Sequence, residues 1–206
     1  MKKILLCNVR MNAGAEKSVY KSEDKYLPVS ETPVRYPVTA FLEKTLKEDD
    51  NVKAILVSKM DAKEQYRENI AQCEEELAFV AKATGAAIDS EVIYTPFSED
   101  AGTHNDLLLQ IVNRIDQDAE ITLDMTYGPK DLVIVQFAAL NFAERFLNCE
   151  IGEIMYGQAD FDENGKVTNT RICEMGSLYY LNSIVNQVKC SDPAKAAEML
   201  KVLVEM

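Results

Sequence analysis

The sequence predicts an α/β protein with a Rossmann-like, mostly parallel sheet, helices on both faces of it, and a C-terminal β-hairpin and helices. Two observations predict this class. Short apolar runs alternate with longer segments in which apolar residues recur every three or four positions. No internal repeat or low-complexity tract interrupts that alternation. Strands that alternate with helices favour right-handed crossovers, and these place helices on both faces of a parallel sheet.

Strands are predicted where apolar runs are bounded by polar or turn-forming residues. In chain order these runs cover residues 3–9, 52–58, 88–95, 121–125 and 151–157. Beyond the last run, Asn164-Gly165 is a favoured pair for a type I′ hairpin turn. Residues 168–175 are therefore expected to return antiparallel to the strand before them.

Helices are predicted between the strands from the spacing of apolar residues. The first begins at Pro37, because proline suits the first turn of a helix. The second ends near Gly85, since glycine commonly follows the last helical residue. The third begins around His104. Two further helices close the chain, one at about 177–189 and one from Pro193.

The fourth helix, expected from Lys130 to Leu147, is apolar nearly all round. Such a helix is buried on more than one side, and in a chain of this length the extra face indicates a subunit interface. Residues 1–190 are expected to form one Rossmann-like domain, with residues 191–206 a C-terminal helix packed on it. Residues 10–36 form one long irregular stretch, well above the usual loop length of about 4–6 residues, which is typical of a functional or mobile segment.

Charge and composition exclude several classes of function. The chain has 206 residues, a hydrophobic fraction of 47% and a net charge of −12, so it can build a core but lacks the basic surface that long nucleic acids need. Residues 1–40 nevertheless carry seven Lys/Arg against four Asp/Glu, a net of +3. A small anionic ligand near this segment is therefore compatible with the acidic chain.

The cysteines and the apolar runs point to a cytoplasmic protein with no membrane partner. Five cysteines are scattered without a CxxC pair, which is typical of reduced thiols, and Cys7 is expected to be buried and inert. No apolar run has the length of a bilayer span, and the basic start of the chain is not followed by a signal-peptide pattern.

No metal site and no cofactor are expected. The single histidine, His104, excludes a histidine-rich site and is interpreted as a residue of a helix-capping region. The acidic run Glu74-Glu75-Glu76 and the pair Asp49-Asp50 are interpreted as solvated helix surface.

Three polar, glycine-containing segments follow predicted strands, at residues 8–18, 124–130 and 156–160. In a parallel sheet these segments open on one edge, where α/β proteins bind ligands. The first segment contains neither GxGxxG nor GxxxxGK[ST], so an ordinary dinucleotide fingerprint and a P-loop are excluded.

The first segment offers donors for phosphate in Arg10, Asn12, Gly14 and Lys17. The alternative is a basic surface loop without a ligand.

The second segment, "DMTYGPK", holds more polar groups than a turn requires. Asp124 suits a turn former or a helix cap, Gly128 permits close backbone approach, and Pro129 suits a first helical turn. Lys130 opposes the helix dipole, a conflict that a bound anion removes, although a solvated lysine costs little. Tyr127 is suited to stacking on a base, or to an ordinary place at the rim of the core.

The segments "ITLDMTYGPKDLVIVQFAALNFAERF", "GEIMYGQAD" and "YPVTAFLEKTL" resemble the CRISPR-associated Rossmann-fold (CARF) proteins, in the subgroup named for a DxTHG motif. Asp124, Thr126 and Gly128 match that motif, whereas Tyr127 replaces its histidine. The resemblance extends over most of the chain. It implies a homodimer whose shared pocket binds cyclic oligoadenylate, the messenger of type III CRISPR immunity, as a tetra- or hexa-adenylate.

The resemblance leaves two functions open. One is a metal-independent ring nuclease, in which the 2′-hydroxyl of the ligand attacks the adjacent phosphate and the protein aligns the groups and stabilises charge. The other is a sensor that binds the ring without cutting it and regulates a separate partner. A Rossmann-like enzyme for an unrelated mononucleotide is a third possibility.

The candidate residues are the same for both functions. Those expected to be catalytic in a nuclease are Arg10, Thr126 and Lys130. Those expected to bind the ligand are Asn12, Ala13, Gly14, Asp124, Met125, Tyr127, Gly128, Pro129, Gly157 and Gln158.

Overall fold

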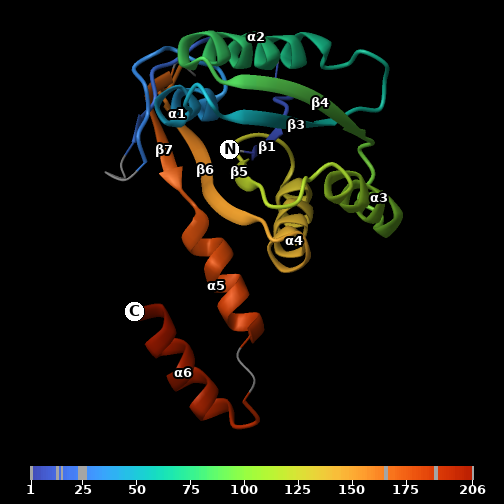
Figure 1. Ribbon diagram of the computed structural model, residues 1–206, viewed down its shortest axis with the longest axis vertical. Helices are drawn as coiled ribbons and strands as arrows, with labels where there is room; N and C mark the ends of the chain where they lie inside the picture. The colour runs from blue at the N-terminus through green and yellow to red at the C-terminus, as the bar shows by residue number, and fades with distance from the viewer. Residues whose placement is uncertain are drawn as a thin grey trace. The chain divides into compact units, whose positions relative to one another are not determined.

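The computed structural model is an α/β fold, as predicted (Figure 1). It describes residues 2–12, 14, 16–22, 27–164, 167–187 and 190–205. The chain divides into two compact units, Met1–Glu174 and Met175–Met206, which are considered separately. The predicted domain of residues 1–190 spans this division.

The first unit is built on a seven-stranded sheet with the order β2-β7-β6-β5-β1-β3-β4. In chain order, the strands are β1 (Lys2–Asn8), β2 (Lys21–Ser22), β3 (Asn51–Lys59), β4 (Ala87–Thr95), β5 (Glu120–Asp124), β6 (Glu150–Phe161) and β7 (Val167–Glu174).

Five of these strands are parallel neighbours, and β7 returns antiparallel to β6, as the hairpin signal predicted. Gly165 of that signal lies outside the described residues. β6 is longer than the predicted residues 151–157, because its hairpin pairing continues from Met155 to Phe161. The two-residue strand β2 pairs with β7 at one edge.

Four helices cover the sheet: α1 (Pro37–Thr45), α2 (Arg67–Thr84), α3 (Ala101–Val112) and α4 (Lys130–Phe146). α1 packs against α2 and α3 against α4, and Figure 1 shows α2 on one side of the sheet with α3 and α4 on the other. Pro37 begins α1, and Gly85 ends α2 at a φ of 80°, as predicted.

The core lies around the central strand, where Leu5, Leu6 and Cys7 are fully buried. A hydrogen bond with Cys73 of α2, together with burial, raises the pKa of the Cys7 thiol well above its ordinary value. The prediction that Cys7 is buried is therefore confirmed.

The segment from residue 10 to residue 36 is not wholly irregular. Besides β2 it contains an antiparallel bridge between Ser18 and Val34, with amide–carbonyl distances of 2.9 Å in both directions. Tyr20, Leu27 and Tyr36 are buried in the core. The described part of this segment is therefore attached to the core at several points.

The second unit contains α5 (Gly176–Gln187) and α6 (Pro193–Glu205), close to the two terminal helices that the sequence predicts. Of the helices within the described residues, none has both the length and the apolar character needed to cross a membrane.

Candidate functional site

The strand order places a topological switch between β1 and β5. The chain leaves β1 toward β3 on one side and leaves β5 toward β6 on the other. Ligands of open α/β sheets bind beyond the carboxyl ends of the strands at such a point. Two of the three predicted segments, those after β1 and β5, begin here, and the third lies within β6.

Arg10 lies just after β1 and is buried at 2% exposure. Its Nη2 donates to Asn69 Oδ1 at 3.1 Å and to Gln72 Oε1 at 2.9 Å, and both partners belong to α2. Its Nε and Nη1 are buried and have no hydrogen-bond partner among the described residues. Arg10 is thus a buried cation that is held by neutral amides.

The rest of the first segment lies at the surface. Asn12 and Gly14 are exposed, and Gly14 has a φ of 73°, a backbone conformation that favours glycine. The carbonyl oxygen of Asn12 accepts a long hydrogen bond of 3.5 Å from Asn69 Nδ2. Ala13 lies outside the described residues.

Asp124 ends β5 and is 1% exposed. Its Oδ1 accepts the Thr126 amide at 2.8 Å, so the turn-forming role predicted for it is confirmed. Burial raises the pKa of Asp124 to about 6, against the lowering effects of Thr126 and the Val38 amide. Asp124 does not cap α4, whose N-cap is Pro129 without a side-chain hydrogen bond; its carboxyl group instead lies by the first turn of α1.

Thr126 joins the loop after β5 to β6. Its Oγ1 accepts the Gly157 amide at 2.8 Å. A Cβ atom on Gly157 would lie 2.3 Å from Pro37 Cγ, so this position needs a glycine for the close approach of α1 to β6. The structure thus brings together Asp124, Thr126 and Gly157.

Tyr127 is a half-buried residue that packs against the core. Its hydroxyl donates to the Arg35 carbonyl oxygen at 2.6 Å, and its ring meets Tyr36 edge-on at 5.5 Å. Burial raises the pKa of Tyr127 above its ordinary value. The phenol is therefore a neutral anchor between the loop after β5 and the residues before α1.

Gly128 has a φ of 89°, and a Cβ atom there would lie 2.8 Å from Leu132 Cδ1. Lys130, two residues later and the first residue of α4, is exposed and has no ion pair among the described residues. Met125 donates its amide to the Met155 carbonyl oxygen at 3.0 Å, and Gln158 Oε1 accepts from Arg171 Nε at 3.1 Å.

Two acidic residues expected on solvated surface are buried, so those predictions were wrong. Glu76 is 4% exposed and accepts the Arg35 amide at 2.8 Å, the Tyr36 amide at 3.0 Å and the Thr39 hydroxyl at 3.2 Å. It satisfies donors at the start of α1. Asp50, at 5% exposure, accepts the Lys47 amide in the turn before β3.

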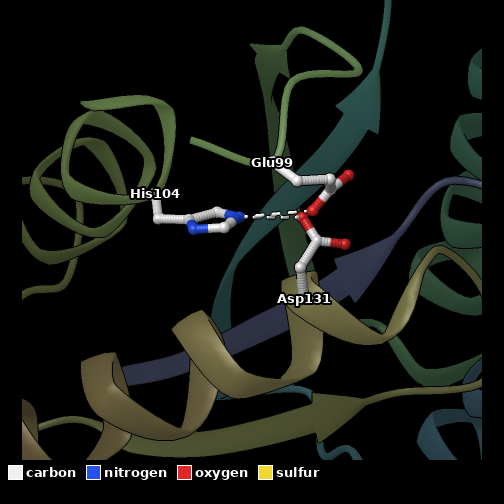
Figure 2. Close-up of side chains that lie close together, drawn as sticks. All are labelled: Glu99, His104 and Asp131. Carbon is white, nitrogen blue, oxygen red and sulfur yellow. Dashed lines mark hydrogen bonds and ion pairs between the residues drawn. The ribbon is translucent and has the colours of Figure 1, made fainter. Parts of the chain in front are cut away.

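A second polar cluster at the carboxyl edge was missed by the sequence reasoning (Figure 2). Glu99 precedes α3, His104 lies in its first turn, and Asp131 lies in the first turn of α4. His104 Nε2 is 3.3 Å from Glu99 Oε2 and 3.5 Å from Asp131 Oδ2. His104 therefore does more than take part in a capping region; Asp100 is the N-cap of α3.

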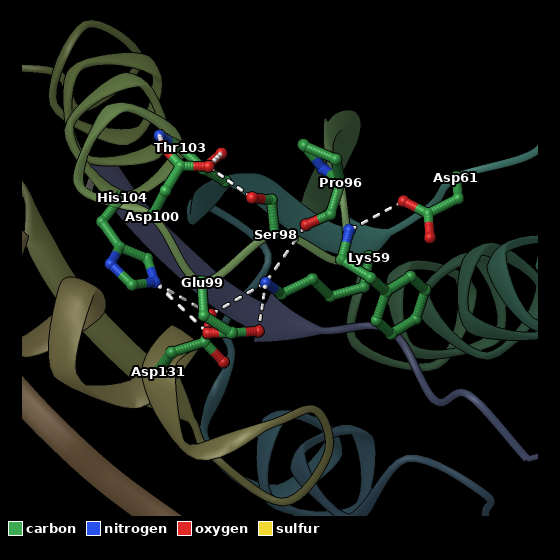
Figure 3. Close-up of polar contacts among 10 residues, drawn as sticks. Lys59, Asp61, Pro96, Ser98, Glu99, Asp100, Thr103, His104 and Asp131 are labelled. Carbon is green, nitrogen blue, oxygen red and sulfur yellow. Dashed lines mark hydrogen bonds and ion pairs between the residues drawn. The ribbon is translucent and has the colours of Figure 1, made fainter.

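Lys59, at the end of β3, completes this cluster (Figure 3). Its side chain is 1% exposed, and Nζ is 2.8 Å from Asp131 Oδ2 and 3.3 Å from Glu99 Oε1, and donates to the Pro96 carbonyl oxygen at 3.2 Å. Although burial raises the pKa of Asp131, its contacts with Lys59 outweigh this and lower it below the ordinary value.

The sequence did contain a signal for the cluster. Lys59 follows the second predicted strand directly, Glu99 follows the third, and Asp131 follows the segment after the fourth. The argument that ligands bind beyond the carboxyl ends of the strands applies equally to these three residues. They were missed because they lie outside the glycine-containing segments 8–18, 124–130 and 156–160.

No protein-family model matches this chain, and no curated protein matches it. The resemblance to CARF proteins therefore depends on the motif residues themselves, of which Asp124, Thr126 and Gly128 form the turn at the end of β5.

Proposed function

We propose that this chain binds a cyclic oligoadenylate as a homodimer, at the carboxyl edge of the sheet between β1 and β5. The observation that carries the proposal is the start of α4. There, an exposed ammonium group on Lys130 follows a glycine at positive φ, and no side chain caps the helix. A cation beside a helix N-terminus that no side chain caps suits a phosphate group, although the Leu132 amide already donates to the Pro129 carbonyl oxygen.

Other helix starts at this edge are less suited to an anion. The first turn of α1 faces the carboxyl groups of Glu76 and Asp124. The first turn of α3 is capped by Asp100, which accepts the Thr103 amide at 2.9 Å. Carboxylates in these positions take the donors that a phosphate needs and repel its charge. The first turn of α4 also carries a carboxylate, Asp131, but Lys59 pairs with it at 2.8 Å and offsets its charge.

The resemblance narrows the ligand from phosphate in general to a ring of adenylates. The motif residues Asp124, Thr126 and Gly128 follow β5, and the tyrosine-glycine pair Tyr156-Gly157 lies on the adjacent strand β6. A twofold pocket made from two copies of this edge suits a ring of identical nucleotides.

The contacts favour binding over cleavage. Arg10 is held by α2, and the Thr126 hydroxyl is engaged with Gly157. Of the three residues predicted to be catalytic, this leaves Lys130 exposed to a ligand. A sensor of the ring is thus the function that the geometry supports best, and ring cleavage by alignment of the 2′-hydroxyl is the alternative.

The test is equilibrium binding of cyclic tetra- and hexa-adenylate to the wild-type protein and to Lys130→Ala. We expect Lys130→Ala to weaken binding at least about tenfold, because a charge-assisted contact to phosphate is worth about 1.5–3 kcal/mol. Lys47→Ala is the matched control, since Lys47 is exposed but precedes β3, at the opposite edge of the sheet.

The same samples, incubated with EDTA and resolved for linear products, separate the two functions. Binding without linear product supports the sensor, whereas linear product that is lost in Lys130→Ala supports the nuclease. Absence of binding to either ring would contradict the proposal. Equal weakening in both lysine variants would contradict the assignment to α4.

A further inference from the structure

We propose that Glu99, His104 and Asp131 form a binding site for a divalent transition-metal ion, with Zn²⁺ the expected occupant. The site shares the first turn of α4 with the proposed nucleotide site but uses other side chains, and it does not depend on that proposal. It is formed by the connection between β4 and α3 and by the first turns of α3 and α4 (Figure 2).

The spacing of the three side chains fits a tetrahedral ion. One atom of each lies within 4.8 Å of the other two, and His104 Nε2 is 3.3 Å and 3.5 Å from oxygens of Glu99 and Asp131. Around a tetrahedral Zn²⁺ with bonds of about 2.0–2.2 Å, neighbouring ligand atoms are about 3.3–3.5 Å apart. The side chains therefore need little movement to close on an ion.

Buried carboxylate oxygens without hydrogen bonds are suited to coordinating a cation. Both carboxylate oxygens of Asp131 are buried without a hydrogen bond among the described residues, and Oδ2 lies 2.8 Å from Lys59 Nζ as an ion pair. The two carboxylates and the one ammonium of Glu99, Asp131 and Lys59 sum to one negative charge in excess. A buried carboxylate oxygen without a partner is costly, and coordination to a metal removes that cost.

Lys59 holds one oxygen of each carboxylate. It contacts Oε1 of Glu99, so Oε2 remains beside His104, but it shares Oδ2 of Asp131 with His104, so an ion requires Lys59 Nζ to move off Oδ2 or Asp131 to turn Oδ1 toward the ion. Carboxylate ligands are commonly oriented by a hydrogen bond to their other oxygen. The positive charge of Lys59 also lowers the affinity for a second cation, so we expect weaker binding than at a site without a lysine.

The loop that carries Glu99 is held in place before any ion binds (Figure 3). The Pro96 carbonyl oxygen accepts from Lys59, the Phe97 amide donates to Asp61 at 2.8 Å, and Ser98 donates to Asp100. A site with fixed ligands loses less entropy on binding.

The ligand chemistry indicates the class of ion. One imidazole nitrogen with two carboxylate oxygens suits Zn²⁺, Co²⁺ or Mn²⁺, whereas Mg²⁺ and Ca²⁺ prefer oxygen ligands alone. Three protein ligands leave a fourth position for water. Exposures of 31% for His104 and 58% for Glu99 give an ion access from solvent.

The experiment is titration of metal-stripped full-length protein with Zn²⁺, followed by calorimetry, and with Co²⁺, followed by visible absorption. We expect one Co²⁺ site with the d–d bands of a tetrahedral nitrogen–oxygen environment. His104→Ala and Asp131→Asn should each weaken binding at least about tenfold, because even loss of a residue that supports a ligand typically costs about 10–100-fold. Asp106→Asn is the matched control, since Asp106 is an exposed acid on α3 outside the cluster.

Several outcomes would overturn the metal site. Unchanged affinity in His104→Ala, or equal loss in Asp106→Asn, would show that the ion binds elsewhere. A Co²⁺ spectrum dominated by thiolate charge transfer would assign the ion to the free cysteines, of which Cys190 is exposed. Absence of binding would leave the cluster as an ion-pair network. Lys130→Ala should bind Zn²⁺ normally, which separates this site from the nucleotide proposal.

Discussion

At the scale of single residues, Asp124 matches the first position of the DxTHG motif and lies in surroundings that disfavour its charged form. Its carboxyl group is almost wholly buried, and that burial raises its pKa to about 6 from an ordinary value of 3.8. The folded protein therefore holds a proton on Asp124 at pH values where the unfolded chain has released it. Between about pH 4 and pH 6, this residue lowers the free energy of unfolding as the pH rises.

The substitution Asp124→Asn tests this linkage. Asparagine does not titrate, so the variant should gain stability relative to wild type as the pH rises from 4 to 7, by up to about 3 kcal/mol for a shift of this size. The measurement is urea unfolding at pH 4, 5, 6 and 7, with the exposed Asp106→Asn as control. A stability difference between Asp124→Asn and wild type that does not change with pH would contradict a raised pKa.

Tyr127 shows how one residue changes the meaning of a motif. A histidine at this position can carry protons near neutral pH, whereas the phenol of Tyr127 has a raised pKa and donates to a backbone carbonyl. Its hydroxyl and its contact with Tyr36 connect the loop after β5 to the start of α1. These contacts are consistent with a positioning residue and not with a proton carrier.

At the scale of elements, Glu76 joins α2 to the start of α1. No side chain next to α1 in the sequence caps its N-terminus. Instead Glu76, which lies on the neighbouring helix α2, accepts the Arg35 and Tyr36 amides with its carboxylate. Its negative charge also complements the positive end of the helix dipole.

We expect Glu76→Gln to lower the free energy of unfolding by about 1–3 kcal/mol, because an amide donor then faces backbone amides that need an acceptor. Glu75→Gln, on the exposed side of the same helix, should change it by less than about 0.5 kcal/mol. Thermal and urea unfolding of both variants measures this. Equal effects of the two substitutions would show that Glu76 does not anchor α1.

The sequence predicted the elements well, because their signals are local. Apolar runs located the five parallel strands, and Asn164-Gly165 predicted the hairpin between β6 and β7. Pairing between distant segments was harder to predict. The bridge of Ser18 with Val34 depends on hydrogen bonds that no apolar period reveals.

The candidate site was predicted in part. The turn of Asp124, Thr126 and Gly128 follows from residue type and spacing, since each has a local reason. The strand-edge argument places the cluster around Lys59 at the right edge of the sheet, but local spacing does not show that its members meet, because they come from three parts of the chain. The burial of Glu76 could have been predicted from its position, because it lies three residues after Cys73 and one before Leu77, on the apolar face of α2.

At the scale of the whole first unit, α4 connects most of the features described above. Asn8 of β1 and Gln136 of α4 exchange two buried hydrogen bonds of 3.2 Å and 2.7 Å. Asp131 reaches Lys59 and His104, and Lys130 carries the exposed charge at the helix start. The inner side of α4 thus fixes its position on the sheet, which leaves its outer side available for a partner.

Much of that outer side is apolar, although its last turn also carries the exposed Glu144 and Arg145. Ile134 is 71% exposed, Phe142 38% and Phe146 68%, and the two phenylalanine rings lie 4.9 Å apart. Exposed apolar residues aligned on one helix are typical of an interface. A second copy packed on this stripe agrees with the burial that the apolar pattern of α4 predicts.

We therefore expect the wild-type protein to sediment as a dimer and Ile134→Lys or Phe146→Lys to shift it toward monomer, because each places a charge in an apolar contact. Sedimentation velocity over a range of concentrations measures this. Phe79→Lys is the control, since Phe79 is 51% exposed on α2 and remote from the stripe. If the ring binds across the twofold axis, the α4 variants should also weaken cyclic oligoadenylate binding while still unfolding in one cooperative transition. Dimers that persist in both α4 variants would place the interface elsewhere.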